Sequence, residues 1–260
     1  MRSANSAVLV ATLYIPAHSK GASRMIDALI GGLVALAIAV VLPANPLNLL
    51  RPQAGRVLEC IANARRAAAE AIRERDAYLA AEVLKQTQDS PSFLDDFKTA
   101  LKAAEEIAAI SPIRWNCRSQ LKRYVRLAQP IEDALRNTKV LIRRTVAALL
   151  HDEKLSGGVH HAIAKLADAV DLLSIELAQG RDPAAARNDM RNVAASAGLD
   201  LIGDGGLSSR VVLAQLRSIT VDLLQATGIT RDQALAALQG EQLEEQAIAI
   251  VQLQTTGAKQ

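Results

Sequence analysis

The stretch VLECIANARRAAAEAIRERDAYLAAEV, residues 57–83, decides the class of the fold. Apolar residues recur in it at intervals of three, four and seven, which is the period of one helix face. They are Val57, Ile61, Ala64, Ala68, Ile72, Leu79 and Val83. The opposite face is charged and carries Arg65, Arg66, Glu70, Arg73, Glu74 and Glu82. Pro52 suits the first turn of a helix, so the pattern predicts one amphipathic helix from Pro52 to about Gln88.

The helical period continues through the rest of the chain, and turn residues divide it into segments. The expected helices cover residues 92–110, 114–150, 159–179, 182–198, 207–227 and 230–240, with a possible extension over 241–254. Pro130 predicts a kink or a break inside the longest of them. Gly180 suits the position that ends a helix, and Asp182 with Pro183 suits the start of the next. Thr230 is the expected cap of the last helix.

Composition also favours an all-α fold. Half of the 260 residues are apolar but only 2% are aromatic, so aliphatic residues supply the hydrophobicity. Long helices favour Ala and Leu, whereas sheets favour aromatic and β-branched residues. The net charge of +3 is not concentrated in basic blocks with interleaved aromatics, so no nucleic-acid partner is expected. Cys60 and Cys117 lie far apart, outside any metal-ligand spacing, and suit thiols in a reducing compartment.

The stretch MIDALIGGLVALAIAVVL, residues 25–42, predicts a membrane span. It has one charge, Asp27, at its start, and its length just exceeds the lower limit of about 17 residues for crossing a bilayer. Gly31 and Gly32 suit close packing between spans. The run AVLVATLYI, residues 7–15, is half a span.

The sequence therefore predicts a membrane segment over 1–43, with one and a half spans, and a cytoplasmic bundle of long helices over 44–260. A buried core helix over 26–42 is the main alternative. A signal peptide fits less well, because no clear cleavage site follows the apolar run.

Charged residues beside the predicted span, 25–42, indicate its orientation in the membrane and a candidate ion pair. Two cations, Lys20 and Arg24, precede the span. Four follow it: Arg51, Arg56, Arg65 and Arg66. The excess places the C-terminal side in the cytoplasm and the chain in the inner (plasma) membrane. Arg24 and Asp27, three residues apart, can form an ion pair at the membrane edge, and a role of Asp27 in a substrate or proton path is the sharper alternative.

No constellation of side chains indicates catalysis. His160 and His161 are adjacent, so on a helix they point about 100° apart and do not converge on a metal ion. The glycine-rich loop over 203–206 lacks the Lys-Ser/Thr pair of a phosphate-binding loop. We expect no catalytic residues, no cofactor and no metal site, and hence no enzyme. The basic residues between Arg114 and Arg144 form either a solvated face or a surface for anionic lipid headgroups or a charged partner.

Several short motifs resemble a known family. They are the run from Arg24 through Asp27 to Gly31 that leads into a span ending at Leu42-Pro43, the segment from Ser111 to Trp115 followed by Arg143-Arg144, and the stretches around Leu216-Arg217-Ser218, Val221–Leu224 and Thr227-Gly228. Together they are similar to the C-terminal portion of the aromatic acid exporter, or fusaric-acid-resistance-like (FUSC), family.

The resemblance implies an inner-membrane protein with several spans and a cytoplasmic helical domain, associated with export of aromatic acids or related small compounds. The chain departs from the family in lacking the other spans, since it begins inside what would be the penultimate one. We therefore expect a membrane-anchored helical protein, the C-terminal part of an exporter-like permease. Its expected partners are membrane lipid and either further copies of itself or a partner transmembrane subunit. The alternative function is a soluble, all-helical interaction or regulatory module.

Overall fold

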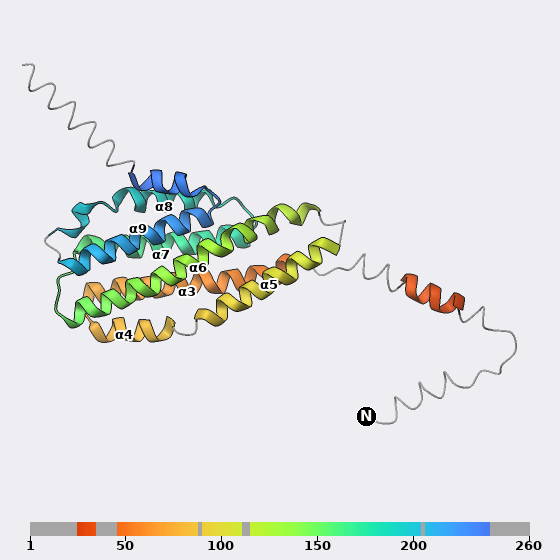
Figure 1. Ribbon diagram of the computed structural model, residues 1–260, viewed down its shortest axis with the longest axis horizontal. Coiled ribbons are helices and arrows are strands. Elements are labelled where there is room, and N and C mark those ends of the chain that lie inside the picture. The colour runs from red at the N-terminus through yellow and green to blue at the C-terminus, as the bar shows by residue number, and fades with distance from the viewer. Residues whose placement is uncertain (1–24, 35–45, 88–89, 111–114, 204–205, 240–260) are drawn as a thin grey trace, which may run out of the picture. The chain divides into compact units, whose positions relative to one another are not determined.

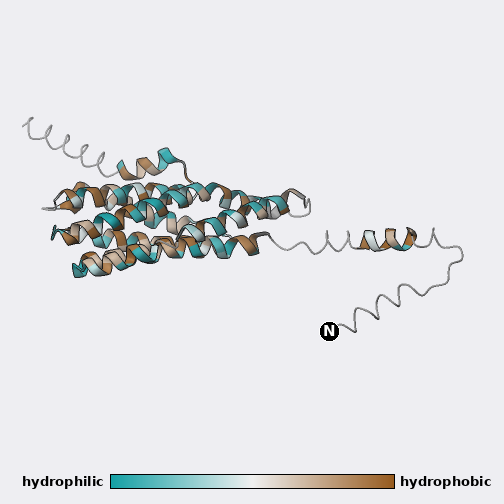
Figure 2. Ribbon diagram, turned by 60° about the horizontal axis from the view of Figure 1, so that its bottom comes forward, coloured by the Kyte–Doolittle hydropathy of each residue, from teal (hydrophilic) through white to brown (hydrophobic). Residues whose placement is uncertain are grey.

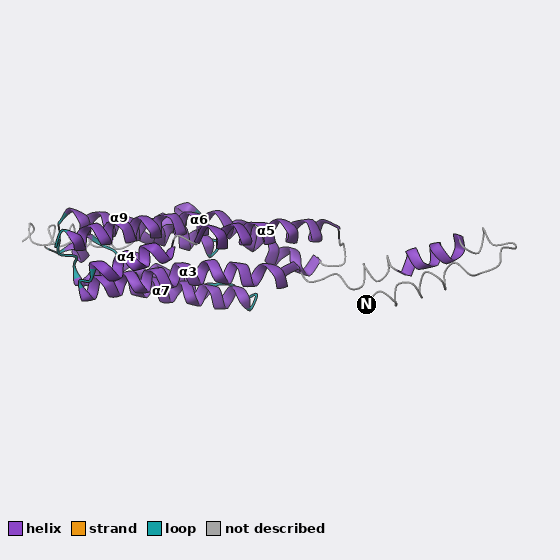
Figure 3. Cartoon of the chain, turned by 90° about the horizontal axis from the view of Figure 1, so that it is seen from below, coloured by secondary structure: helices purple, strands orange, loops and turns teal. Residues whose placement is uncertain are grey.

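The computed structural model describes residues 25–34, 46–87, 90–110, 115–203 and 206–239. The chain divides into two units, Met1–Ala44 and Asn45–Gln260. In the first unit, residues 25–34 form a helix. The second unit is a bundle of helices, and no strand occurs in the described ranges of either unit (Figure 3). The all-α prediction is confirmed for this part of the chain.

The bundle contains helices of very different length. In chain order they are α3 (Pro46–Glu74), α4 (Ala77–Gln86), α5 (Ser90–Ile110), α6 (Trp115–Leu150), α7 (Gly157–Ala178), α8 (Ala184–Ser196), the 3-10 helix η3 (Leu199–Ile202) and α9 (Leu207–Ala226), followed by a helix over 231–239. Figure 1 shows the long helices side by side. Figure 2 shows that each alternates between apolar and polar residues along its length, as amphipathic helices do.

Helix α3 is the central element of the bundle, because α4, α5, α6 and α7 all pack against it. It runs antiparallel to α7, where Arg66 forms an ion pair with Asp171 at 2.5 Å. It runs parallel to α6, since the start of α3 contacts Gln120 through Arg51 at 2.9 Å and its middle contacts Thr138. Neighbours on several sides bury most of α3 and leave one charged face, with Arg66, Glu70 and Arg73, in contact with water.

One continuous core joins these helices. The predicted apolar face of α3 is confirmed, because Val57, Ile61, Ala64, Ala68 and Ile72 are all buried. Every member of the core cluster lies between Leu47 and Leu238. Burial of each large aliphatic side chain contributes about 1.5–3 kcal/mol, so the core is the main source of the bundle's stability.

The prediction of one helix from Pro52 to Gln88 is wrong. Helix α3 begins earlier, at Pro46, and ends at Glu74. Arg75 has a φ of 56°, which no helix accommodates, and it pairs with Asp152 at 2.8 Å. Asp76 then accepts a hydrogen bond from the N–H of Leu79 and begins α4. The chain therefore reverses here, and α4 packs back on α3.

The break that Pro130 could have introduced does not occur, because α6 runs unbroken from Trp115 to Leu150 with Pro130 inside it. Proline removes one helix hydrogen bond, but flanking residues pack firmly enough to keep the helix continuous: Leu127, Ile131 and Ala134 are all buried. Gly180, by contrast, has the predicted role, with a φ of 71° directly after α7.

Helix α8 is capped by a residue that the sequence did not indicate. The prediction that Asp182 caps it is wrong, because Asp182 instead pairs with Arg187 at 3.0 Å. The carboxylate of Glu176, on α7, accepts hydrogen bonds from the N–H groups of Ala185 (3.3 Å) and Ala186 (3.0 Å). Glu176 and Ala186 are both buried, so water would not replace the carboxylate at the N–H of Ala186.

We expect Glu176→Ala to lower the free energy of unfolding by about 1–2 kcal/mol, because one buried and one partly buried N–H group lose their acceptor. Asp182→Ala is the matched control and should cost less than about 1 kcal/mol, since it removes only a largely exposed ion pair. Urea titrations of both variants measure the difference. An equal or larger loss for Asp182→Ala would contradict the assignment of Glu176 as the cap.

Membrane crossing is not visible in the described residues. Among the helices of this part of the chain, none has both the length and the apolar character that a bilayer span needs. Residues 35–42 of the predicted span and the whole of the predicted half-span, 7–15, lie outside the described residues.

Candidate functional site

The residues predicted to act at the membrane edge fall in the first unit. Asp27, Gly31 and Gly32 lie on the helix over 25–34 and are exposed. Arg24 lies outside the described residues, so its pairing with Asp27 stays a prediction. A Cβ added at Gly31 or Gly32 would meet no atom within 4 Å, so the space beside both glycines is empty.

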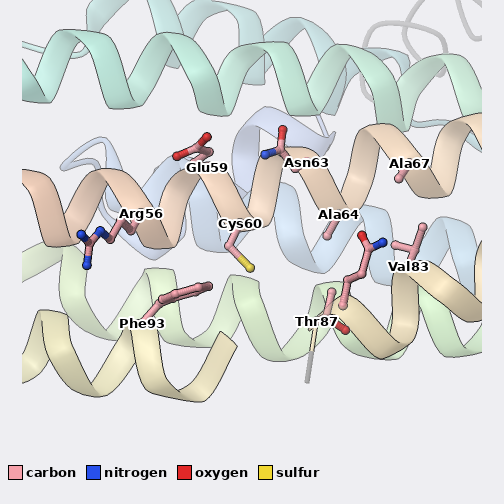
Figure 4. A pocket seen from close by; sticks show the side chains of 10 residues that line it. Arg56, Glu59, Cys60, Asn63, Ala64, Ala67, Val83, Thr87 and Phe93 are labelled. Carbon is pink, nitrogen blue, oxygen red and sulfur yellow. The ribbon is translucent and has the colours of Figure 1, made fainter. Parts of the chain in front are cut away.

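A pocket opens between α3, α4 and α5, with a volume of about 480 Å³. Its apolar part comes from three helices, through Cys60 on α3, Val83 on α4 and Phe93 on α5. In Figure 4 the thiol of Cys60 and the ring of Phe93 point toward each other across the space. Small-molecule sites typically measure about 300–1,000 Å³ and are mostly apolar with a few polar groups, so the pocket has the size of a ligand site.

The polar residues that line this pocket are Arg56, Glu59, Asn63, Gln86 and Thr87. Within the part of the chain that the structure describes, neither Arg56 nor Glu59 forms an ion pair, although they are three residues apart on α3. Arg56 makes only a long hydrogen bond, of 3.4 Å, to Gln53. A guanidinium beside an apolar cavity suits a ligand with an apolar body and one anionic group.

The Cys60 thiol is not set up as a nucleophile. Burial raises its pKa, and the charge of Lys139 offsets this only in part. The thiolate is the reactive form, so a raised pKa lowers the reactivity of Cys60 at neutral pH. The group therefore acts as a weakly polar part of the pocket wall.

We expect iodoacetamide to alkylate Cys60 at least about tenfold more slowly at neutral pH than it alkylates a cysteine introduced by Tyr78→Cys. Tyr78 is 81% exposed on α4, so it provides an accessible comparison in the same fold. Mass spectrometry of the two peptides gives both rates in one experiment. Equal alkylation rates at the two cysteines would mean that the Cys60 thiol is accessible to the reagent and that its pKa is not raised.

The most unusual group in the bundle is the guanidinium of Arg65, on α3. Arg65 is fully buried, and its Nη2 donates to Oγ1 of Thr138 on α6 at 3.0 Å. Its Nε and Nη1 have no hydrogen-bond partner among the described residues. Burial lowers the pKa of Arg65 to about 9, and the charge of Asp222 counteracts this. The assignment of Arg65 to a solvated face is therefore wrong, because α6 covers that side of α3.

Asp222, on α9, is the acidic residue whose charge acts on Arg65, although the two side chains do not form an ion pair. Its Oδ2 accepts a hydrogen bond from Nδ2 of Asn137 at 2.7 Å, and no ion pair joins it to a described residue. Burial raises the pKa of Asp222 to about 6, against the hydrogen bond from Asn137 and the charges of Arg231 and Arg65, which lower it. Asp222 also lines a second hollow of about 670 Å³ together with Arg217 and Arg231.

Sequence patterns could not place these groups together. Arg65, Thr138 and Asp222 come from three helices, and each lies within an ordinary amphipathic pattern. A weak signal existed for Asp222, which lies in the strongly apolar run over 219–224. No group of three or more His, Cys, Asp or Glu side chains in the described ranges could hold a metal ion.

Comparisons with known proteins give one relative. No protein-family model matches the chain, and no solved structure matches it. The chain is 32% identical over 237 residues to an uncharacterized protein of Corynebacterium glutamicum, a match that covers 89% of this chain. The chain spans about three fifths (61%) of the length of that relative.

Proposed function

We propose that this chain is a membrane-anchored helical protein in which residues 25–42 hold it at a bilayer. The observation that carries the proposal is the exposure of the helix over 25–34. Its six large apolar side chains, Met25, Ile26, Leu29, Ile30, Leu33 and Val34, are each 51–72% exposed. Contiguous exposed apolar side chains need a non-aqueous partner, and the sequence continues without a charge to Leu42.

In this proposal the helical unit from Asn45 onward is a cytoplasmic domain of an exporter-like permease for aromatic acids or related small compounds, in the inner (plasma) membrane. The family resemblance supports the transport part, and the excess of cations after the span supports the orientation. The domain would assemble or regulate the transmembrane part, with Gly31 and Gly32 packing against other spans of the same or a partner chain.

A second candidate is an all-helical binding module without membrane attachment. The pocket between α3, α4 and α5 favours it, because a cavity of about 480 Å³ has room for a small molecule. Both candidates assign no catalytic role to the chain.

Fractionation of the expressed full chain, with a carbonate wash of the membrane pellet, separates the two. Retention in the washed pellet until detergent is added is the expected result. As a matched variant, Leu29→Asp with Leu33→Asp should release the chain, because each charge in an apolar span costs about 2.5–3.5 kcal/mol. Release of the unmodified chain by carbonate would reject the anchor and favour the binding module.

A further inference from the structure

We propose that one face of α6 is a docking surface for anionic lipid headgroups. This inference rests on the proposed membrane anchor. Helix α6 has eight cationic residues and two acidic ones over Trp115–Leu150. Five of the cations are exposed, and one of them, Arg136, pairs with Asp133. We call the other four, Lys122, Arg126, Arg143 and Arg144, the basic stripe.

Spacing places the basic stripe on one side of the helix. Lys122 and Arg126 are four residues apart, and steps of three and four residues lead from them through Gln129, Asp133, Arg136 and Val140 to Arg143 and Arg144. Such steps keep side chains on the same helix face. The 22 steps from Lys122 to Arg144 span about 33 Å along the helix, which is long enough to contact many headgroups.

The bundle itself does not neutralise the basic stripe. Both acids of α6 already have cationic partners outside the stripe, because Glu132 pairs with Lys98 of α5 at 2.7 Å and Asp133 pairs with Arg136 of the same helix. No member of the stripe forms an ion pair with a described residue. Unpaired cations along one face create a positive potential that attracts an anionic surface.

The N-terminal part of the basic stripe lies beside the start of α3. The first turns of α3 lie beside the N-terminal part of α6, because Nη2 of Arg51 donates to Oε1 of Gln120 at 2.9 Å. Lys122 and Arg126 follow within two turns. The stripe therefore starts beside the first turns of α3.

Lipid fits this surface better than nucleic acid does. A surface for single-stranded nucleic acid typically has aromatic side chains among its cations for stacking, and Tyr124, the aromatic residue between Lys122 and Arg126, is buried. Anionic lipid needs only charge, and each Lys or Arg near such a surface contributes about one factor of five in affinity.

The test measures the reactivity of Lys122 in the full chain reconstituted into vesicles. One set of vesicles is phosphatidylcholine, and the other contains phosphatidylglycerol as well. Acylation by an amine-reactive reagent is followed by mass spectrometry. Lys85 on α4 and Lys165 on α7, both exposed, are internal references. We expect the rate at Lys122, relative to the references, to fall about fivefold or more when phosphatidylglycerol is present, and to recover at high salt.

Two triple variants sharpen the result. Arg126→Glu with Arg143→Glu and Arg144→Glu should abolish the protection of Lys122. The control, Arg181→Glu with Arg191→Glu and Arg210→Glu, makes the same charge change at exposed cations elsewhere and should retain it. Equal protection of Lys122 in both kinds of vesicle, equal effects of the two variants, or protection by duplex DNA in place of lipid would overturn the docking surface. Failure of the anchor has a different signature, because the chain would then leave phosphatidylcholine vesicles altogether.

Discussion

Arg65→Met should raise the free energy of unfolding by about 1–3 kcal/mol, although it removes a central residue of the bundle. The guanidinium is fully buried, makes one hydrogen bond and leaves two nitrogen atoms without partners. A buried charge with incomplete hydrogen bonding costs several kcal/mol, and methionine fills a similar volume without that cost. Thr138 keeps its hydrogen bond to the carbonyl of Ala134 at 2.7 Å, so its hydroxyl stays satisfied.

Arg65→Ala is the matched comparison, because it also removes the charge but leaves a cavity. We expect it to be less stable than Arg65→Met by about 2–5 kcal/mol, the usual difference for truncating a large buried side chain. Urea titrations of the full chain in mild detergent give both values. If Arg65→Met proved less stable than the native chain by more than about 1 kcal/mol, the guanidinium would have to be better satisfied than its contacts indicate.

Asp222 should make the stability of the bundle depend on pH. Its pKa in the folded chain, about 6, is above the value of 3.8 for an unperturbed carboxyl, so the folded state holds the proton more tightly than the unfolded state. The free energy of unfolding should therefore fall as pH rises from about 4 to about 6, and stay low above that range. Asp222 still borders an open hollow, so we expect a total change of about 1–2 kcal/mol.

Asp222→Asn isolates this contribution. It keeps an oxygen acceptor for Asn137 and removes the ionisation, so it should gain about 1–2 kcal/mol at neutral pH and show a flatter profile between about pH 4 and 6. Asp189→Asn, at an exposed position on α8, is the control and should leave the profile unchanged. A native profile that rises through this interval and is unaffected by Asp222→Asn would show that the proton is not held there.

The helical period predicted the inward face of α3 and most of its charged face, but not the burial of Arg65. Period alone separates apolar from charged residues, and it assumes that a charged face meets water. Helix α3 has neighbours on several sides, so Arg65 is buried while Arg66, one position along, is exposed. How many helices surround a given helix is a property of the tertiary arrangement, which no local pattern contains.

The sequence predicted the helix ends that depend on the backbone preference of a local residue. It did not predict the helix ends that depend on a side chain from a distant part of the chain. Gly180 ends α7 because a positive φ favours glycine, and that preference is visible in the sequence. The break at Arg75 involves a non-glycine residue at positive φ, paired with Asp152 from 77 residues away. The cap of α8 likewise comes from α7. The pocket shares this property, since its lining comes from three helices.

The central position of α3 has a consequence for the order of events during synthesis. Helix α3 is the first element of the bundle to leave the ribosome, but α7, on which it packs most extensively, ends only at Ala178. Roughly 100 residues must still be added after Glu74, which takes about 5–20 s at usual translation rates. During that interval the apolar face of α3 is not fully buried, so we expect chaperones to bind the nascent chain. We also expect the bundle to fold late in translation rather than helix by helix.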